Sequence, residues 1–453
     1  MRTKLVAAVS LAALLGSPVE AARPQAQLVE DIYVGPKGSR AYERVALGDV
    51  ALFRAREEET GEELWRSDGT ESGTYLVSDI NPGEYDSDII ELTRLGDILL
   101  FNAADVSGGP ELWKTDGTEA GTERVKDINP GPGSSYPYSL TRMHGKVFFS
   151  AFDPEVGPAL WKSDGTSDGT KVVADMGPGN EGTNPQELEN VQGTLFFLGN
   201  DGTTGPELWK SDGTQDGTGL VRDIQPGPGN SNADWFVGVK DTLFFQAGNS
   251  ESGSELWKSD GTRMGTKVVK EIGPGQKGSG PFSLYPFESK LLFAAQTEKH
   301  GIELWITDGT RAGTRMLKDI NPGVDSSEPF GLERSGADVF FAAKDGSSGV
   351  ELWRTDGTSK GTQRIKDIHP GRYDSDPWQL KNLEGTLFFQ ARDGVHGMEL
   401  WGSDGSAKGT KLVADINPGE GRSSPGFFTL LGQTLFFGAR HPETGWEPWK
   451  LDL

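Results

Sequence analysis

The sequence predicts an all-β protein: a nine-bladed β-propeller of four-stranded blades, in which an N-terminal strand completes the C-terminal blade. Three observations support this fold: a repeat of constant length, consecutive apolar residues in one strand of each repeat, and chain ends that form complementary parts of one repeat. Nine blades exceed the usual range of about four to eight. The repeat count nevertheless leaves no spare unit, and it implies a wide axial channel.

The repeat is marked by a tryptophan that recurs every 48 residues, with no insertion or deletion between copies. An acidic residue followed by Ile or Met recurs at the same interval, from Asp31 to Asp415. Periods of this size indicate propellers or solenoids. Each tryptophan should bury a large area and should offer its indole N–H to an acceptor. The tryptophans of this structural motif are Trp65, Trp113, Trp161, Trp209, Trp257, Trp305, Trp353, Trp401 and Trp449.

Each repeat contains four runs that are typical of β-strands. In one repeat the runs cover residues 138–142, 146–151, 159–162 and 170–175, and they are rich in Val, Phe, Trp, Leu and Thr. The second run has consecutive apolar residues, as in Phe148-Phe149, which indicates that both faces of the sheet are covered. No segment has a sustained helical period, so we expect no helix outside the first twenty or so residues.

The residues between the runs have structural roles. Asp116-Gly117 is a hairpin turn pair, and the hydroxyls of Thr118 and Thr122 can cap the same loop. Residues 129–131, Asn-Pro-Gly, suit a turn in which Gly takes a positive φ. We attribute these motifs to structure because chemistry rarely needs nine similar copies.

The chain ends indicate a closed ring. Residues 28–32 match the fourth strand of a repeat, as in residues 412–416, whereas residues 447–453 match a third strand with no fourth after it. Pairing the two ends would remove both exposed edges. We therefore predict a single propeller domain over residues 28–453, preceded by a short linker over residues 22–27.

Residues 1–21 have the pattern of a signal peptide. Arg2 and Lys4 precede an apolar run, residues 5–15, that is too short to span a bilayer. We therefore expect a secreted or periplasmic protein without a membrane span. The net charge of −23 argues against nucleic acid as a partner, and the absence of Cys excludes disulfides and thiol chemistry. We expect a monomer.

The motif Glu111-Leu112-Trp113-Lys114-Thr115-Asp116-Gly117-Thr118 resembles that of the ELWxxDGT-repeat proteins, exported and mostly bacterial proteins also described as hyalin-like. The resemblance covers residues 28–453. Single repeats depart from the motif at Ala159, Ser406 and Pro448. The resemblance implies a repeat fold and export, and it implies no particular reaction or ligand.

A column of residues at the start of the first strand offers a candidate binding site at the channel mouth. It consists of Tyr42, Ile90, Tyr138, Gln186, Asp234, Phe282, Phe330, Trp378 and Gly426. The candidate binding residues are Tyr138, Trp235, Phe282, Phe330 and Trp378, because aromatic side chains can stack on sugar rings. The alternative, which we favour, is that the column packs between blades.

Acidic columns could bind calcium, which takes several oxygen ligands. The acidic residues of the Asp-Ile pairs and those at the end of the second strand (Glu57, Asp105, Asp153, Asp201, Asp345 and Asp393) should share one face. No calcium-loop motif occurs, and Asp86-Ser87-Asp88 and Asp374-Ser375-Asp376 are only distant matches. Turn capping explains the same residues. The five His residues have no ligand spacing, so we expect no metal or other cofactor, with calcium as the one possibility.

Two functions fit this sequence. The first is a non-catalytic binding or scaffold module for a glycan, polymer or protein partner, because the repeats are so regular. The alternative is a carbohydrate-active hydrolase or lyase with carboxylates at the channel mouth. A pocket lined by two carboxylates about 5–10 Å apart would favour the enzyme.

Overall fold

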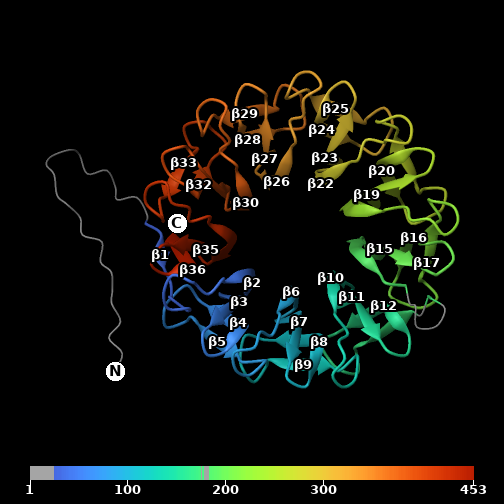
Figure 1. Cartoon of the computed structure of the whole chain (residues 1–453). Helices are drawn as coiled ribbons and strands as arrows, with labels where there is room; N and C mark the ends of the chain where they lie inside the picture. The colour runs from blue at the N-terminus through green and yellow to red at the C-terminus, as the bar shows by residue number, and fades with distance from the viewer. Residues whose placement is uncertain (1–24, 175, 178–182) are drawn as a thin grey trace, which may run out of the picture.

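The structure, a computed structural model, describes residues 25–174, 176–177 and 183–453. These residues form nine four-stranded antiparallel sheets that are arranged as the blades of a ring (Figure 1). The predicted nine-bladed β-propeller is therefore confirmed. The predicted signal peptide, part of the predicted linker and Asp175 lie outside the described residues.

The strands keep the predicted order within each blade, and the first strand is innermost. The first strands are β2 (Tyr42–Leu47), β6 (Ile90–Leu95), β10 (Tyr138–Met143), β14 (Gln186–Val191), β18 (Asp234–Val239), β22 (Phe282–Phe287), β26 (Phe330–Ser335), β30 (Trp378–Leu383) and β34 (Gly426–Leu431). The second strands are β3 (Val50–Glu57), β7 (Ile98–Asp105), β11 (Lys146–Asp153), β15 (Thr194–Asn200), β19 (Thr242–Asn249), β23 (Lys290–Thr297), β27 (Asp338–Lys344), β31 (Thr386–Ala391) and β35 (Thr434–His441).

The outer half of each blade holds the tryptophan strand and a short last strand. The third strands are β4 (Gly61–Ser67), β8 (Gly108–Thr115), β12 (Gly157–Ser163), β16 (Pro206–Ser211), β20 (Gly253–Ser259), β24 (Gly301–Thr307), β28 (Val350–Thr355), β32 (Glu399–Ser403) and β36 (Gly445–Asp452). The fourth strands are β5 (Tyr75–Ser78), β9 (Glu123–Lys126), β13 (Lys171–Ala174), β17 (Gly219–Arg222), β21 (Lys267–Lys270), β25 (Arg315–Lys318), β29 (Gln363–Lys366), β33 (Lys411–Ala414) and, closing the ring, β1 (Gln27–Leu28).

We number the blades in chain order, so that blade 1 is β2–β5 and blade 9 is β34, β35, β36 and β1. The antiparallel order places the loops after second and fourth strands on one face of the ring and the remaining turns on the other. We call the first the NPG face, after the turn at residues 129–131. The second is the DGT face, after the turn at residues 116–118. The axial rim denotes the first two residues of the innermost strands, on the NPG face.

The ring closes as predicted. In the pairing of β1 with β36, Gln27 lies opposite Lys450 and Leu28 opposite Trp449. The Val29 N–H then donates to the Pro448 carbonyl at 2.9 Å. Blade 9 is thus completed by the N-terminal end of the described chain, next to the C-terminus (Figure 1).

The hydrophobic core is divided among the blade interfaces. In the described residues one cluster of buried apolar side chains lies at each of the nine interfaces. Phe149 belongs to the cluster shared with blade 2, and its neighbour Phe148 to the cluster shared with blade 4. Consecutive apolar residues are therefore buried on opposite sides of one sheet, as predicted.

The DGT loop confirms the predicted capping roles. Asp116 Oδ1 accepts hydrogen bonds from the N–H and hydroxyl of Thr118, at 2.9 and 2.6 Å. Thr118 Oγ1 in turn accepts from the Gly121 N–H at 3.1 Å, and the Thr122 hydroxyl donates to the Thr118 carbonyl at 2.7 Å. The hydrogen bond from the Thr118 hydroxyl lowers the pKa of Asp116. The carboxylate that organises this loop therefore stays ionised.

Basic side chains join neighbouring blades through the tryptophans. Lys126 Nζ donates to the Thr170 carbonyl of the next blade at 2.8 Å and lies 5.8 Å from the Trp161 ring centre. Such a cation over an aromatic face is attracted by the ring quadrupole. Four other interfaces have the same arrangement, through Arg222, Lys270, Lys318 and Lys366. This link was not predicted from the sequence.

The prediction that each tryptophan N–H finds an acceptor is wrong. All nine motif tryptophans are buried, yet none of their Nε1 atoms has a hydrogen-bond partner within the described part of the chain. The rings are positioned by their faces instead, as where Trp161 stacks on Phe149 with ring centres 6.5 Å apart. Packing on the ring faces therefore sets their orientation, and the N–H group does not.

Candidate functional site

Exposed apolar side chains are concentrated on the NPG face. Among the described residues, eleven of the fifteen exposed large apolar side chains lie there, in the loops or at the strand ends that form this face. They are Val34, Tyr85, Ile90, Val106, Tyr136, Phe152, Trp235, Val324, Tyr373, Trp378 and Val395. The other four are Tyr75, Leu220, Met264 and Leu453. Exposed apolar side chains that gather on one surface mark interaction sites.

Tyrosines follow the same distribution. Of the eight tyrosines in the chain, six lie in the loops after fourth strands or at the first residue of an innermost strand. They are Tyr33, Tyr42, Tyr85, Tyr136, Tyr138 and Tyr373. The same loops are rich in Gly, Ser, Asn and Asp. Tyrosine combined with small polar residues is the composition of adaptable recognition loops.

The axial rim gathers the aromatic residues that were predicted as a binding site. Trp235 contacts Phe282 of the next blade, with ring centres 6.5 Å apart, and Phe330 contacts Trp378 at 5.5 Å. Trp378 is 50% exposed and Trp235 is 42% exposed, whereas the two phenylalanines are half-buried. These four residues belong to blades 5 to 8. The two phenylalanines therefore pack against tryptophans whose remaining surface faces solvent.

The fifth predicted residue lies elsewhere on the rim. Tyr138, in blade 3, is half-buried, and its hydroxyl donates to Asn184 Oδ1 at 2.7 Å. Near the ring closure, Tyr42 packs on Phe427 and Trp446 at 5.3 and 5.6 Å. The expected packing between blades thus describes these positions, whereas Trp235 and Trp378 keep an exposed surface.

The second residue of every innermost strand has a left-handed backbone. Its φ lies between 51° and 66° in all nine blades, and the strand pairing shifts register at this point. Gly331 suits this conformation, and two other blades have the small side chains of Ser139 and Ser283 at this position. Trp235 occupies it at φ 58°. A bulky residue in this conformation is strained, and such strain is concentrated at functional sites.

The axial rim is acidic. Its eighteen positions contain Glu43, Glu91, Glu187 and Asp234, and they contain no basic residue. Burial, and then the nearby Asp234 carboxyl, raise the pKa of Glu187. Burial likewise raises the pKa of Glu43, although Arg54 opposes this shift. The rim therefore has a negative potential that disfavours acidic ligands.

The two predicted acidic columns do share the NPG face. In blade 2, Arg124 lies 3.9 Å from the carboxylates of both Asp105 and Asp127. In blade 8, His396 lies 2.9 Å from Asp393 and 4.0 Å from Asp415. The hydrogen bond to Asp393 is the main cause that raises the pKa of His396. A basic side chain therefore stands between the two columns in these blades.

The carboxylates at the ends of second strands also cap turns. Asp201 Oδ1 accepts four hydrogen bonds from Thr203 and Thr204, at 2.7 to 3.0 Å. Although burial opposes the shift, these bonds lower the pKa of Asp201 to about 2. In the described ranges, no three His, Asp or Glu side chains are arranged to hold a metal ion. Calcium binding stays a prediction.

The two distant matches to a calcium motif are engaged otherwise. Asp86 accepts from the Glu62 N–H at 2.9 Å and pairs with Arg56. Asp374 accepts from the Val350 N–H at 2.7 Å. The remaining histidines on this face are also in contact with neighbours, as where His300 Nδ1 lies 2.9 Å from Asp319.

The glutamate of the repeat motif is a buried structural group that the sequence analysis missed. Glu351 accepts from the N–H groups of Ile368 and His369 at 2.7 and 3.3 Å, and its Oε2 lies 2.8 Å from the Ser375 hydroxyl. That hydroxyl is also 3.0 Å from the Val350 carbonyl. Burial raises the pKa of Glu351 to about 7. When Glu351 is protonated, its carboxyl group can donate to the Ser375 hydroxyl. The Ser375 hydroxyl can then donate its own proton to the Val350 carbonyl.

This arrangement recurs around the ring. Burial raises the pKa of Glu63 and Glu447 to about 8, and that of Glu207 and Glu399 to about 7. Blade 3 is the exception, because Ala159 replaces the glutamate there. The signal that could have identified these residues is an acidic side chain recurring inside an apolar strand.

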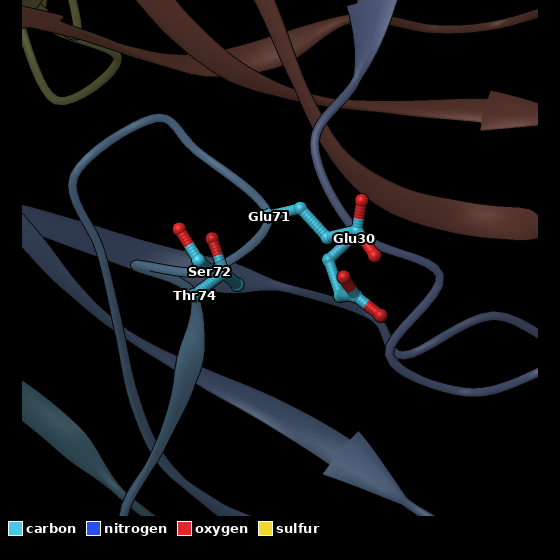
Figure 2. Close-up of a pocket in the computed structure, with 4 residues that line it drawn as sticks. All are labelled: Glu30, Glu71, Ser72 and Thr74. Carbon is cyan, nitrogen blue, oxygen red and sulfur yellow. The ribbon is translucent and has the colours of Figure 1, made fainter.

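Two hollows were found away from the axial rim. The first, of about 480 Å³, lies between blades 9 and 1, beside their outermost strands β1 and β5. It is lined by Glu30, Glu71, Ser72 and Thr74 (Figure 2). The second, of about 450 Å³, lies between blades 7 and 8 and includes Arg354 and Asp404. Only the first has two carboxyl groups, and it lies far from the predicted channel mouth. The enzyme alternative stays a prediction.

Known proteins resemble this chain in fold alone. No protein-family profile matches the sequence, and no curated relative matches it. Among solved structures, the computationally designed Ika8 protein has a TM-score of 0.45 and 16% identity, over 82% of this chain and 97% of the other. A prolyl endopeptidase has a TM-score of 0.43 and 12% identity, over 72% of this chain and 49% of the other.

The propeller domain of the Trilobed protease from Pyrococcus furiosus, described as having an open velcro topology, has a TM-score of 0.36 and 12% identity, over 73% of this chain and 98% of the other. Within the described ranges of the present chain, no helix is long and apolar enough to cross a membrane. These similarities transfer no activity, so the function has to be argued from the surface of the ring itself.

Proposed function

We propose that the protein is a non-catalytic binding module that presents its NPG face to a glycan, polymer or protein partner. The observation that supports this most directly is the position of the exposed large apolar side chains, since eleven of the fifteen in the described part of the chain lie on that face. The acidic charge and the predicted leader suit an exported monomer. The resemblance to ELWxxDGT-repeat proteins, which implies export, belongs to the same proposal.

Regular loops favour binding over catalysis. Catalysis needs one asymmetric cluster, whereas no repeat carries an insertion that could build one. The carboxylates of the described turns are mostly engaged in capping, as at Asp116 and Asp201. A face of nine similar loops can instead contact a repetitive ligand at several points, which raises overall affinity without any single strong site.

A glycan and polymer array, run in parallel with an assay for released reducing ends, tests this proposal. The purified protein should bind at least one probe without cleaving it. Tyr136→Ser and Tyr373→Lys should weaken that binding by roughly tenfold, because each removes an exposed aromatic side chain. The chain supplies these replacements itself, since Ser424 and Lys277 occupy the equivalent positions.

Met264→Ala is the matched control, because Met264 is 90% exposed on the DGT face and Ala312 stands at the equivalent position. Its binding should equal that of the unmodified protein. Weakening confined to Met264→Ala would place the binding surface on the other face and contradict the proposal. Release of reducing ends that Glu71→Gln abolishes would favour the carbohydrate-active enzyme and assign it to the hollow in Figure 2.

A further inference from the structure

The aromatic sector of the axial rim has an arrangement that packing between blades does not explain. Trp235, Phe282, Phe330 and Trp378 occupy four consecutive blades, and half of each tryptophan stays exposed. In the adjoining blades 9 and 1, Tyr42 packs on Phe427 and Trp446 instead. The exposed rings are therefore confined to one sector, so nine-fold repetition does not account for them.

Trp235 carries two costs that the fold does not require. Its backbone is left-handed at φ 58°, a conformation that seven other blades achieve with a smaller or more flexible side chain. The other aromatic residue in this column, Phe427, gains packing against Tyr42. Among the described residues the ring contact of Trp235 is with Phe282, and the side chain remains 42% exposed. A strained and exposed indole is typical of a functional surface.

The surrounding polar groups indicate the chemistry of the ligand. Asp234 precedes Trp235, and its carboxyl lies near that of Glu187. Carboxyl groups beside an aromatic face can accept hydrogen bonds from hydroxyl or amino groups of a ring stacked on that face. The rim contains four carboxyl groups and no basic side chain. An acidic polymer would therefore be repelled.

We propose that the axial rim of blades 5 to 8 binds an extended polysaccharide that lacks acidic groups, with sugar rings stacked on Trp235 and Trp378. This inference rests on the proposed binding function and specifies its ligand. The four aromatic residues come from four blades, so a ligand that contacts all of them must be extended. The carboxyl groups of Asp234 and of the neighbouring Glu187, which lies in blade 4, accept hydrogen bonds from its hydroxyl or amino groups.

Calorimetric titration with cellohexaose, chitosan hexamer and polygalacturonate tests the inference. At least one of the first two should bind, and polygalacturonate should not. Trp235→Ser and Trp378→Gln should each weaken binding by roughly tenfold, and together by more. Both replacements occur naturally in the ring, since Ser139 and Ser283 share the backbone conformation of Trp235 and Gln186 is equivalent to Trp378. The variants should therefore fold.

Phe427→Ser is the control, because it changes the same backbone position in blade 9, outside the sector, where Phe427 packs against Tyr42, and it should leave binding unchanged. The inference is overturned if neither neutral nor amino oligosaccharide binds, if polygalacturonate binds as well, or if the double variant retains full affinity. Weakening by Tyr136→Ser and Tyr373→Lys alone would keep the NPG face as the binding surface and reject the rim. Melting curves distinguish lost binding from lost structure.

Discussion

The glycine five residues after each DGT aspartate, such as Gly121 after Asp116, stands where an added Cβ would overlap the carboxylate of that aspartate. In blade 2 the carboxylate is that of Asp116, which is held by the N–H and hydroxyl of Thr118. The carboxylate cannot move away without breaking these bonds. The repeat therefore requires Gly at this position to leave room for a side chain, although the Gly121 backbone is not left-handed.

Gly121→Ala should lower the free energy of unfolding by about 1–2 kcal/mol, because the Asp116 cap must be displaced. Thermal unfolding measures the change. Gly219→Ala is the control, since an added Cβ there meets nothing within 4 Å. Equal stabilities of the two variants would contradict the steric explanation.

The buried glutamates make stability depend on pH. Their pKa values in the folded protein, about 7 to 8 for Glu63, Glu207, Glu351, Glu399 and Glu447, lie above the ordinary value of 4.5. Above pH 4.5 the unfolded chain releases protons that the folded protein keeps. Their contribution to stability is therefore complete below pH 4.5 and is lost as the pH rises to about 8.

The melting temperature should accordingly fall by several degrees between pH 5 and pH 9. The DGT aspartates do not oppose this trend, because their pKa values are lowered and their contribution is constant above pH 5. The double variant Glu351→Gln/Glu447→Gln should show a smaller fall. A melting temperature that rises over this range would reject the protonated state of these side chains.

Two replacements of the Glu351 side chain separate its role as a hydrogen-bond acceptor from the effect of its protonation. Glu351→Ala should lower the free energy of unfolding by about 2–4 kcal/mol at any pH, because the N–H groups of Ile368 and His369 lose their acceptor. Glu351→Gln should cost much less at pH 7, since its amide can imitate the protonated acid.

At the scale of the elements, the basic residue at the end of a fourth strand connects two sheets. Lys318 donates to the Thr362 carbonyl at 2.7 Å and lies 5.5 Å from the Trp353 ring centre. The equivalent position holds Ser78, Ala174, Ala414 and Glu30 in the other blades. The interfaces that follow blades 1, 3, 8 and 9 therefore lack this connection.

Lys318→Ala should lower the free energy of unfolding by about 1–2 kcal/mol through loss of the carbonyl bond and the cation–π contact. Ser78→Lys should raise it by about 0.5–1 kcal/mol, because Trp113 and Thr122 are the equivalent partners. Chemical denaturation measures both. If Lys318→Ala raised the free energy of unfolding and Ser78→Lys lowered it, the link would not stabilise the interface.

Sequence patterns predicted the elements well because they are local. The predicted strand at residues 138–142 is β10, Tyr138–Met143, and the consecutive Phe148-Phe149 lie on opposite sheet faces as expected. The features that were missed depend on neighbouring blades. Lys126 over Trp161, like the exposure of Trp235, follows from where the next sheet lies, which one repeat does not specify.

At the scale of the whole molecule, the ring depends on a short pairing between its ends. The two residues of β1 and the following Val29 join β36, and Val29 is buried in the cluster between blades 9 and 1. This contact joins segments far apart in the sequence. It could be predicted because the two chain ends are complementary parts of one repeat. The closure therefore combines backbone pairing with a share of the core.

A protein that begins at residue 30 should melt several degrees below one that begins at residue 25, because β36 loses its partner and the core loses Val29. Its exposed strand edge should also cause association that increases with concentration. Calorimetry and light scattering measure the two effects. Gln27→Ala changes only an exposed side chain and should behave like the unmodified protein. An unchanged melting temperature in the shortened protein would show that closure contributes little.

The two halves that meet at β1 and β36 are the same whatever number of repeats stands between them. Recombination between two DNA copies of the repeat would remove or add one whole 48-residue unit in frame, and the same halves could still meet. The number of blades in the ring can thus change in a single genetic event. Descendants with one blade more or fewer would form a wider or narrower ring around a ligand, with every interface adjusted to the new angle between neighbouring blades.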